Sequence, residues 1–280
     1  LVYFESKQKA QKGEIIHGFI GAGNIVKAIL TGIDKGGKFT HDEIAIFDRK
    51  EDARENFKSD GYIVYDSIDK LVKNSPIIVV AVTPQAIRSI VPDIKAGITE
   101  KTVLLSVVAG ISTQWYKENI DEKSKVIRCM PTLTAQEGMG SFAVCKSEDI
   151  TDEEFKDVEK FLSSCGILEK IPEDLMDEVV PLNGSAPGYF YHMANVVANE
   201  GEKMGFDKEV ALRLFAQTMK GSAETILNSG MSIETLESKL RLKGGTTIAA
   251  LDKMDELGFE RCIIEGVRAC VARSKELGKL

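Results

Sequence analysis

One short segment, Lys243-Gly244-Gly245-Thr246-Thr247-Ile248, combines residue types that can hold a small anion. Glycines that lead into a helix leave backbone amides free to donate hydrogen bonds, and the two threonines add hydroxyl groups. This arrangement suits a carboxylate. The same residues would also form an ordinary threonine N-cap after a flexible turn, so physical reasoning alone weighs the two interpretations about equally.

A second segment, Gly21-Ala22-Gly23-Asn24-Ile25-Val26, lies where the first expected strand turns into a helix. Gly21 would permit the tight turn, and Gly23 would let the backbone approach a pyrophosphate at the positive end of the helix. Val26 stands where a glycine or alanine usually packs helix against strand. Turn glycines also occur for structural reasons alone, and it is the setting between strand and helix that favours a dinucleotide cofactor.

The charged turn Asp48-Arg49-Lys50 follows the next expected strand. An acid at this point would accept hydrogen bonds from the adenosine ribose and favour NAD, whereas a nearby arginine could pair with the 2′-phosphate of NADP. Because Asp48 and Arg49 are both present, the sequence does not decide between NADH and NADPH. A solvated charged loop is the remaining interpretation.

Two further strand ends carry small or turn-forming residues. Val82-Thr83-Pro84 follows an apolar run, and Pro84 is expected in the first turn of a helix. Ala109-Gly110 follows another strand, where small residues would let the backbone lie against a flat ring. Each stretch alone could be ordinary helix-start chemistry, but with the first two strand ends they line every expected edge of a dinucleotide crevice.

The elements that must position these residues alternate between strand and helix over the first half of the chain. Strands are expected at 14–20, 44–47, 63–65, 77–82, 103–106 and 126–129, with helices at 25–33, 51–58 and 85–91. This alternation predicts an α/β fold with a Rossmann-type doubly wound sheet, covered by helices on both faces. Ligands of such a sheet bind beyond the carboxyl ends of the strands.

The second half of the chain is expected to be helical. Two strand-like stretches at 141–145 and 167–171 flank a helix that Thr151 and Glu154 would start as a capping box. The expected domains are a flexible extension at 1–13, a dinucleotide-binding domain at 14–174 and a helical dimerisation and substrate domain at 175–280. Several of its helices are apolar on more than one side, so we expect a homodimer, with a higher oligomer left open.

Composition excludes several other classes. The chain has 280 residues and a net charge of -7, which argues against a nucleic-acid partner. Its longest apolar run, Ile77 to Val82, is too short for a membrane span of about 20 residues, and no secretion signal is seen. The five cysteines form no CxxC pair and no histidine has metal-ligand spacing, so we expect reduced thiols in a cytoplasmic protein without a metal site.

The chain resembles the pyrroline-5-carboxylate reductase family over nearly its whole length after residue 13. The segments that carry the resemblance are Gly21-Ala22-Gly23-Asn24, Ala81-Val82-Thr83-Pro84-Gln85, Val107-Val108-Ala109-Gly110-Ile111, Arg128-Cys129-Met130-Pro131, Leu182-Asn183-Gly184-Ser185-Ala186-Pro187-Gly188-Tyr189 and Gly244-Gly245-Thr246-Thr247-Ile248-Ala249. The last two segments, correctly ordered and spaced, are the most specific.

This resemblance implies a Rossmann domain for NADPH or NADH and a helical dimerisation domain. The implied reaction reduces 1-pyrroline-5-carboxylate, a small cyclic imino acid, to L-proline. Backbone around Gly244 to Thr247 would hold the substrate carboxylate, and the Thr247 hydroxyl would be the catalytic group beside the ring. Met130 and Pro131 are expected to contact the substrate. The expected cofactor-binding residues are Gly21, Gly23, Asn24, Ile25, Asp48, Arg49, Val82, Thr83, Pro84, Ala109 and Gly110.

The chain departs from the family pattern at several positions near the expected site. Ile25-Val26 follows Gly-Asn where Met-Ala is usual, Thr83 replaces lysine, Thr132-Leu133-Thr134 replaces Asn-Thr-Pro, Leu242-Lys243 replaces Ser-Pro, and Ala186-Pro187-Gly188 replaces Gly-Pro-Ala. Loss of the serine at 242 removes a carboxylate contact, while Lys243 adds a positive charge nearby. A related cyclic imine reductase with a changed substrate is therefore one alternative.

Two other functions stay open. A β-hydroxyacid dehydrogenase would share the architecture, but that family uses a lysine on the helix entering its second domain. Here the matching helix carries Tyr191, His192, Asn195 and Asn199 and no such lysine. The other is a non-catalytic dinucleotide-binding regulator, which would bind cofactor without turnover.

Overall fold

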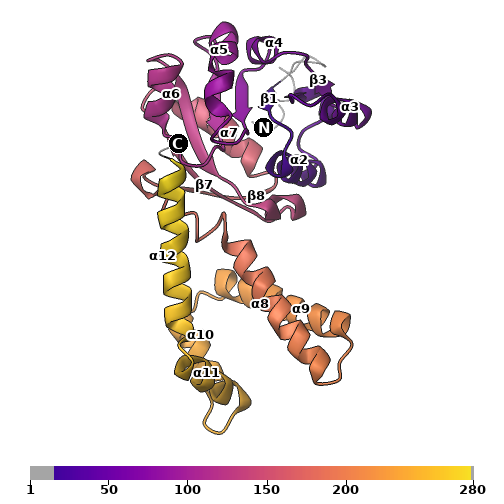
Figure 1. Ribbon diagram of the computed structural model, residues 1–280, viewed down its shortest axis with the longest axis vertical. Coiled ribbons are helices and arrows are strands. Elements are labelled where there is room, and N and C mark those ends of the chain that lie inside the picture. Colours follow the sequence, from indigo (N-terminus) through magenta and orange to yellow (C-terminus); the bar gives the residue numbers. More distant parts are fainter. Residues whose placement is uncertain (1–15, 279–280) are drawn as a thin grey trace, which may run out of the picture. The chain divides into compact units, whose positions relative to one another are not determined.

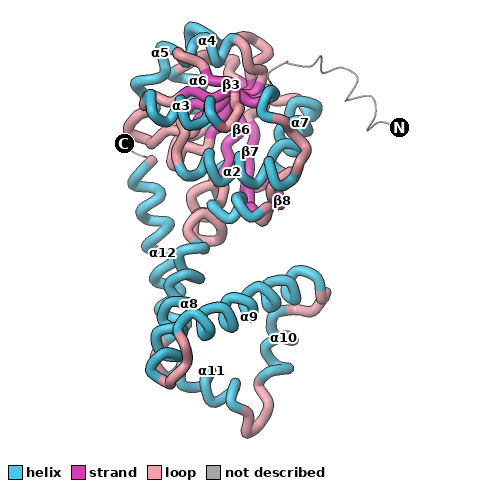
Figure 2. Tube along the Cα trace, turned by 90° about the vertical axis from the view of Figure 1, so that its right-hand side faces the viewer, coloured by secondary structure: helices cyan, strands magenta, loops and turns pink. Residues whose placement is uncertain are grey.

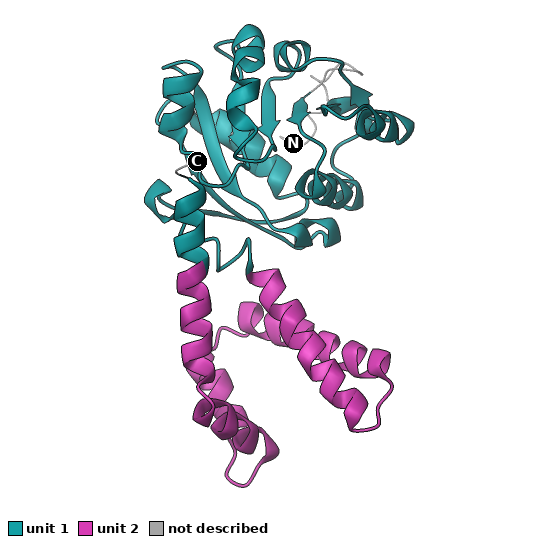
Figure 3. Ribbon diagram, viewed as in Figure 1, with its two compact units in different colours: residues 1–185, 270–280 teal, residues 186–269 magenta. Residues whose placement is uncertain are grey.

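The computed structural model describes residues 16–278 (Figure 1). Contacts divide the chain into two compact units, coloured separately in Figure 3. The first unit continues to Ser185 and takes in the chain from Cys270 onward, and the second is Ala186–Ala269. This division differs from the expected boundary after residue 174, because residues 175–185 pack with the sheet. The expected extension at 1–13 lies outside the described residues.

The first unit is built on one eight-stranded sheet with the strand order β3-β2-β1-β4-β5-β6-β7-β8. Its strands are β1 (His17–Ile20), β2 (Ile44–Phe47), β3 (Ile63–Val64), β4 (Ile77–Val80), β5 (Val103–Ser106), β6 (Lys125–Met130), β7 (Gly140–Lys146) and β8 (Gly166–Lys170). All neighbouring strands are parallel except β6 and β7. The strand order reverses beside β1, which confirms the predicted Rossmann-type doubly wound sheet.

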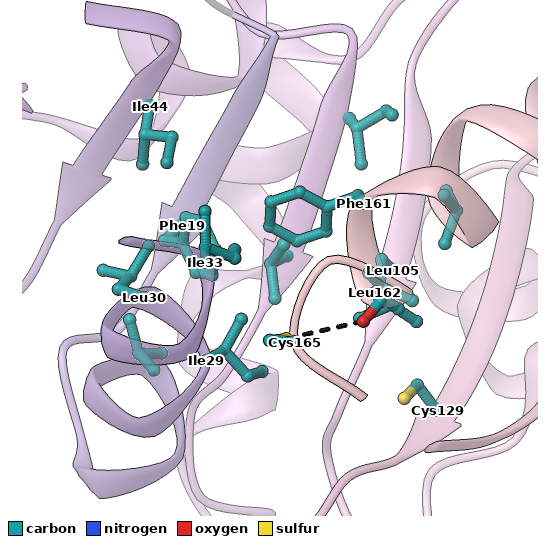
Figure 4. Packing of buried hydrophobic residues seen from close by; sticks show 14 of the residues in the cluster. Phe19, Ile29, Leu30, Ile33, Ile44, Leu105, Cys129, Phe161, Leu162 and Cys165 are labelled. Atoms are coloured by element: carbon teal, nitrogen blue, oxygen red, sulfur yellow. Dashed lines mark hydrogen bonds between the residues drawn. The ribbon is translucent and has the colours of Figure 1, made fainter. Parts of the chain in front are cut away.

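Side chains alternate along each strand and give the sheet two apolar faces. Phe19 and Val79 belong to a cluster with α2 (Asn24–Gly36) and α7 (Asp152–Leu162), part of which Figure 4 shows. Ile20 and Val80 belong to a second cluster with α4 (Ile68–Lys73), α5 (Ile87–Gly97) and α6 (Thr113–Asn119). The unit also contains α3 (Glu51–Ser59) and the short helices η2 (His41–Glu43), η3 (Leu133–Glu137) and η4 (Glu173–Leu175). Helices therefore cover both faces, as expected for buried parallel strands.

His17, on β1, lies inside the first of these clusters. Its side chain is 1% exposed and stacks on Phe161 with ring centroids 3.8 Å apart, while Phe39 meets it edge-on. Neither ring nitrogen has a hydrogen-bond partner among the described residues. Burial, with a smaller contribution from the positive charge of Lys160, lowers the pKa of His17 to about 3. The residue is a neutral core aromatic and not a catalyst.

The loop between β4 and α5 corrects one expectation. Helix α5 begins at Ile87, two residues after the expected start, and β4 ends at Val80. Pro84 therefore lies in the preceding turn and not in the first turn of the helix. That turn is closed by a 2.9 Å hydrogen bond from the amide of Ala86 to the carbonyl of Thr83. The fixed φ of proline suits such a turn as well as a helix start, and sequence alone does not separate the two.

The second unit is helical, and Figure 2 shows its helices as cyan tubes. It comprises α8 (Ala186–Lys203), α9 (Lys208–Asn228), α10 (Ile233–Leu240), α11 (Thr246–Glu256) and the first part of α12 (Phe259–Leu277). Helices α9, α10 and α11 bury no residue, and Leu214 and Leu257 are 60% and 78% exposed. So much uncovered apolar surface requires a partner. No helix within residues 16–278 is long and apolar enough to cross a membrane.

Candidate active site

The turn between β1 and α2 leaves the N-terminus of α2 open. Gly21 has a φ of 104°, and a side chain there would lie 2.4 Å from the carbonyl oxygen of Ala81, so only glycine fits. Gly23 is the N-cap of α2, no side chain caps the helix, and nothing lies within 4 Å of the point where its Cβ would stand. The free amides at this positive helix end suit a pyrophosphate. Asn24 is exposed beside them and Ile25 is half-buried.

The carboxylate of Asp48 is tied to the backbone of this turn. One oxygen accepts a 2.8 Å hydrogen bond from the amide of Ala22, and the other accepts one of 2.8 Å from the amide of Lys50. Arg54 donates to the carbonyl of Asp48 at 2.7 Å. Arg49 and Lys50 are exposed, and their side chains form no ion pair within residues 16–278. The acid thus has a structural role here, and two exposed cationic side chains follow it in the chain.

The loops after β4 and β5 lie side by side, because the amide of Val107 donates to the carbonyl of Val80 at 3.0 Å. Val82 and Pro84 are half-buried and Thr83 is exposed, while Ala109 and Gly110 are half-buried. Gly110 has a φ of 74°, and a side chain there would come within 2.4 Å of Gly278. The end of α12 therefore already explains why residue 110 is glycine. Contact of this loop with a flat ring stays a prediction.

At the carboxyl end of β6, Met130 is half-buried and Pro131 is buried. Two residues earlier, the guanidinium of Arg128 is buried and pairs with Glu173 at 3.0 Å. Burial opposes ionisation of Glu173, but hydrogen bonds from Thr113 and Arg128 hold the pKa of this carboxyl below its usual value. This ion pair anchors the strand that ends at Met130.

Thr132, where the resemblance led us to expect asparagine, is a structural residue in this chain. It is 3% exposed, and its hydroxyl lies 2.8 Å from that of Thr134 and accepts a 2.9 Å hydrogen bond from the amide of Ser141. Sequence reasoning missed Asn183, which is also buried and donates to the carbonyl of Met130 at 2.9 Å. The only sequence indication was its place in a segment that carries the family resemblance.

The N-terminus of α11 is open in the same way as that of α2. Its N-cap is Gly245, no side chain caps it, and no acid lies in its first turn. Gly244 has a φ of 79°, which favours glycine. Thr246 and Thr247 are the first helical residues and both are exposed. The alternative of a threonine N-cap is therefore wrong, and the amides of the first turn remain available to a carboxylate.

The residues before α11 fix this turn. The amide of Gly245 donates to the carbonyl of Leu242 at 2.9 Å. Arg241 pairs with Glu237 of α10 at 2.6 Å and with Asp255 of α11 at 3.3 Å, so it ties the two helices together. Leu242 is 66% exposed, and Lys243 is exposed with no ion pair in the described part of the chain. Lys243 is therefore a cation available to an anionic ligand.

The expected cofactor residues at 21–25, 48–49, 82–84 and 109–110 thus gather at the carboxyl edge of the sheet in the first unit. Residues 243–247 belong to the second unit. No group of His, Cys, Asp and Glu within residues 16–278 could hold a metal ion. Cys145 and Cys165 are buried, and burial raises the pKa of these thiols to about 11 and about 12, so neither is a nucleophile.

A Rossmann-type sheet with an open glycine turn, joined to a helical unit that needs a partner, is typical of nicotinamide-dependent oxidoreductases. Residues 17–110 match the family model described as NADP oxidoreductase coenzyme F420-dependent. Residues 173–277 match the model described as pyrroline-5-carboxylate reductase dimerisation. The chain belongs to the pyrroline-5-carboxylate reductase family.

Relatives match along almost the whole chain. The pyrroline-5-carboxylate reductase of Methanosarcina acetivorans is 31% identical over 94% of this chain and 97% of its own length. The pyrroline-5-carboxylate reductase of Synechocystis is 31% identical over 94% of this chain and 98% of its own length. The NADP-bound structure of the Plasmodium falciparum pyrroline carboxylate reductase is 26% identical, with a TM-score of 0.87 over 96% of this chain and 100% of that one. The family match, including the dimerisation model, supports a homo-oligomer.

Proposed function

We propose that this chain reduces 1-pyrroline-5-carboxylate to L-proline, the last step of proline biosynthesis, with hydride from NADPH or NADH. Relatives named as this reductase align over more than nine-tenths of the chain. The observation that carries the proposal is the open N-terminus of α11 at Gly245, which suits the carboxylate of the substrate. An open N-terminus of α2 at Gly23 suits the phosphates of the cofactor.

In the substrate site, the amides of Thr246 and Thr247 would donate to the carboxylate, and Gly244 and Gly245 would let it approach the backbone. Lys243 would add charge attraction. The Thr247 hydroxyl is proposed as the catalytic group that orients the ring nitrogen or assists proton delivery. A protonated imine is already electrophilic, so little is needed beyond correct placement of the two reactants.

In the cofactor site, Gly21, Gly23, Asn24 and Ile25 would hold the pyrophosphate, with Asp48 and Arg49 at the adenosine ribose. Residues 82–84 and 109–110 would line the path to the nicotinamide, and Met130 and Pro131 would face the substrate. When bound, the reduced nicotinamide supplies the hydride that adds to the carbon of the C=N bond, which yields the secondary amine of proline. Asp48 is held by backbone amides while Arg49 is uncommitted, and the cofactor is proposed to be NADPH or NADH.

For assembly, we propose a homodimer that forms through the helical unit. Dimers could associate further into a higher oligomer through the same apolar surfaces. The uncovered apolar residues of α8, α9 and α10 support it, among them Tyr191, Leu214 and Leu240 at 60%, 60% and 62% exposure. We also propose a cytoplasmic location, which the unpaired cysteines support.

The test is oxidation of NADH and of NADPH, followed at their absorbance band, with 1-pyrroline-5-carboxylate as substrate. Turnover that saturates with substrate is expected, and the ratio of the two cofactors then assigns the preference. Cofactor binding without turnover would contradict the proposal and indicate a regulator.

A second candidate, a related cyclic imine reductase, is favoured by the exposed Leu242 and Lys243 beside the carboxylate site. A panel of cyclic imino acids that differ in ring size and in carboxylate position separates the two functions. Faster turnover of another member of the panel than of 1-pyrroline-5-carboxylate would favour this second candidate.

A further inference from the structure

Asn183 lies in the stretch of chain that leads from the sheet into α8. It is only 6% exposed, although it sits between the exposed Leu182 and the start of a helix. A buried amide must satisfy both its donor and its acceptor, because an unpaired polar group away from water destabilises the fold. Asn183 satisfies its donor with backbone carbonyls far away in sequence and its acceptor with the amide of the next residue.

Its side-chain nitrogen bonds the carboxyl end of β6 and the adjacent strand β7, and its oxygen bonds the next residue in the chain. The side-chain nitrogen donates to the carbonyl of Met130 at 2.9 Å and to that of Ser141 at 3.4 Å, while the side-chain oxygen accepts from the amide of Gly184. A flipped amide would put its oxygen against two carbonyl oxygens, so only one orientation is compatible with these partners. The side chain is thus locked.

Gly184 completes the hold on Met130. A Cβ at residue 184 would lie 3.0 Å from the sulfur of Met130 and 3.4 Å from its Cγ, so the missing side chain leaves room for the thioether. Asn183 therefore bonds the backbone of Met130, and Gly184 lies against the side chain of Met130. The ion pair of Arg128 with Glu173 fixes the same strand two residues earlier.

We propose that Asn183 is a positioning residue for the reduction, which acts by fixing the Met130-Pro131 backbone at the substrate end of the sheet. The inference rests on the proposed function, since Met130 and Pro131 are taken to contact the imino acid. In this role Asn183 would act through that backbone and not by its own contact with substrate or cofactor. Its loss should weaken the productive placement of the substrate and leave cofactor binding intact.

The test compares Asn183→Ala and Asn183→Asp with the parent enzyme. Loss of the bond to Met130 should raise KM for 1-pyrroline-5-carboxylate by about tenfold, the worth of roughly one net hydrogen bond. The Kd of NADPH, measured by fluorescence titration without substrate, should change less than about twofold. A merely structural role would lower the active fraction, so kcat would fall while KM stayed the same.

The pH profile makes the test sharper. The ionised carboxyl introduced by Asn183→Asp cannot donate to Met130, whereas its protonated form can. The KM of this variant, divided by that of the parent at the same pH, should therefore fall as the pH is lowered. The same ratio for Asn183→Ala should not change with pH.

A matched control is Asn119→Asp, because Asn119 is half-buried on α6 and, within residues 16–278, donates only to the local carbonyl of Trp115 at 2.9 Å. This variant should keep the KM of the parent at every pH. Parent activity on 1-pyrroline-5-carboxylate is measured first, and its absence would overturn the proposed function together with this inference. An active parent, with KM unchanged in both Asn183 variants or with flat ratios for both, would overturn the role of Asn183 alone.

Discussion

Replacement of His17 by phenylalanine should change how the stability of this enzyme depends on pH. His17 is 1% exposed, has no hydrogen-bond partner among the described residues and has a pKa of about 3. In the unfolded chain the same imidazole has its ordinary pKa of 6.5. Below that pH the unfolded chain takes up a proton that the folded chain refuses, so acid favours unfolding.

The size of this effect follows from the two pKa values. Stability contributed by neutral His17 is fully present above about pH 6.5 and is lost as the pH falls toward about 3. A pH of 5 lies about 1.5 units below the pKa of His17 in the unfolded chain. At about 1.4 kcal/mol per unit, protonation in the unfolded chain lowers the free energy of unfolding by about 2 kcal/mol. His17→Phe removes the titrating group and keeps an aromatic ring between Phe39 and Phe161.

The assay is urea unfolding at pH 8 and at pH 5, at one fixed protein concentration because association contributes to stability. Trp115 is the only tryptophan and gives a single fluorescence probe. The parent should lose about 2 kcal/mol more than His17→Phe between the two pH values. Phe39→Leu is the control, since it disturbs the same cluster but keeps the imidazole and should keep the pH dependence of the parent. Equal losses in the parent and in His17→Phe would refute the argument.

Three further predictions follow from the site and the surface. Thr247→Val should lower kcat/KM for the imino acid by about tenfold or more with the Kd of NADPH unchanged; steady-state kinetics would contradict this if the variant matched the parent. Gly21→Ala should destabilise the fold by about 2 kcal/mol or more and weaken cofactor binding, because its Cβ would meet the Ala81 carbonyl oxygen at 2.4 Å. Urea unfolding and fluorescence titration test it, and an unchanged midpoint would count against it. Leu214→Glu should shift the protein toward monomers, because it would place a charge in the surface that the second subunit of the proposed homodimer covers. Light scattering measures the molar mass, and a mass equal to that of the parent would contradict this.

The sheet and the glycine turn were predictable because local patterns determine them. Strands that alternate with helices form a parallel sheet, and the connections between parallel strands are right-handed. A glycine is required at position 21 by its positive φ and by the nearby carbonyl oxygen of Ala81. The residues at 21–25 and 48–49 could therefore be assigned to one edge of the sheet from the sequence alone. Assignment of their contacts to a cofactor remains a prediction.

Other features depend on contacts between distant parts of the chain, which sequence patterns do not report. Asn183 reads as an ordinary turn residue beside a glycine, and only the fold reveals that Met130 lies against it. The domain boundary was expected at 174 because the helical pattern begins there, yet residues 175–185 pack with the sheet. The ambiguity at Thr246 is resolved only by the backbone, which makes Gly245 the N-cap.

The course of the chain through the two units has a consequence for synthesis on the ribosome. The first unit is discontinuous in sequence, since the helical unit at 186–269 is inserted before its last segment. Three contacts of that segment, Ser274 with Asp177, Lys275 with Glu178 and Gly278 with Gly110, join it to residues made much earlier. Domains usually fold in order from the N-terminus during translation. Here the first unit cannot be completed until the inserted helices and the segment after them have left the ribosome. Until then the loop at Gly110 in the nascent sheet is not covered by that segment.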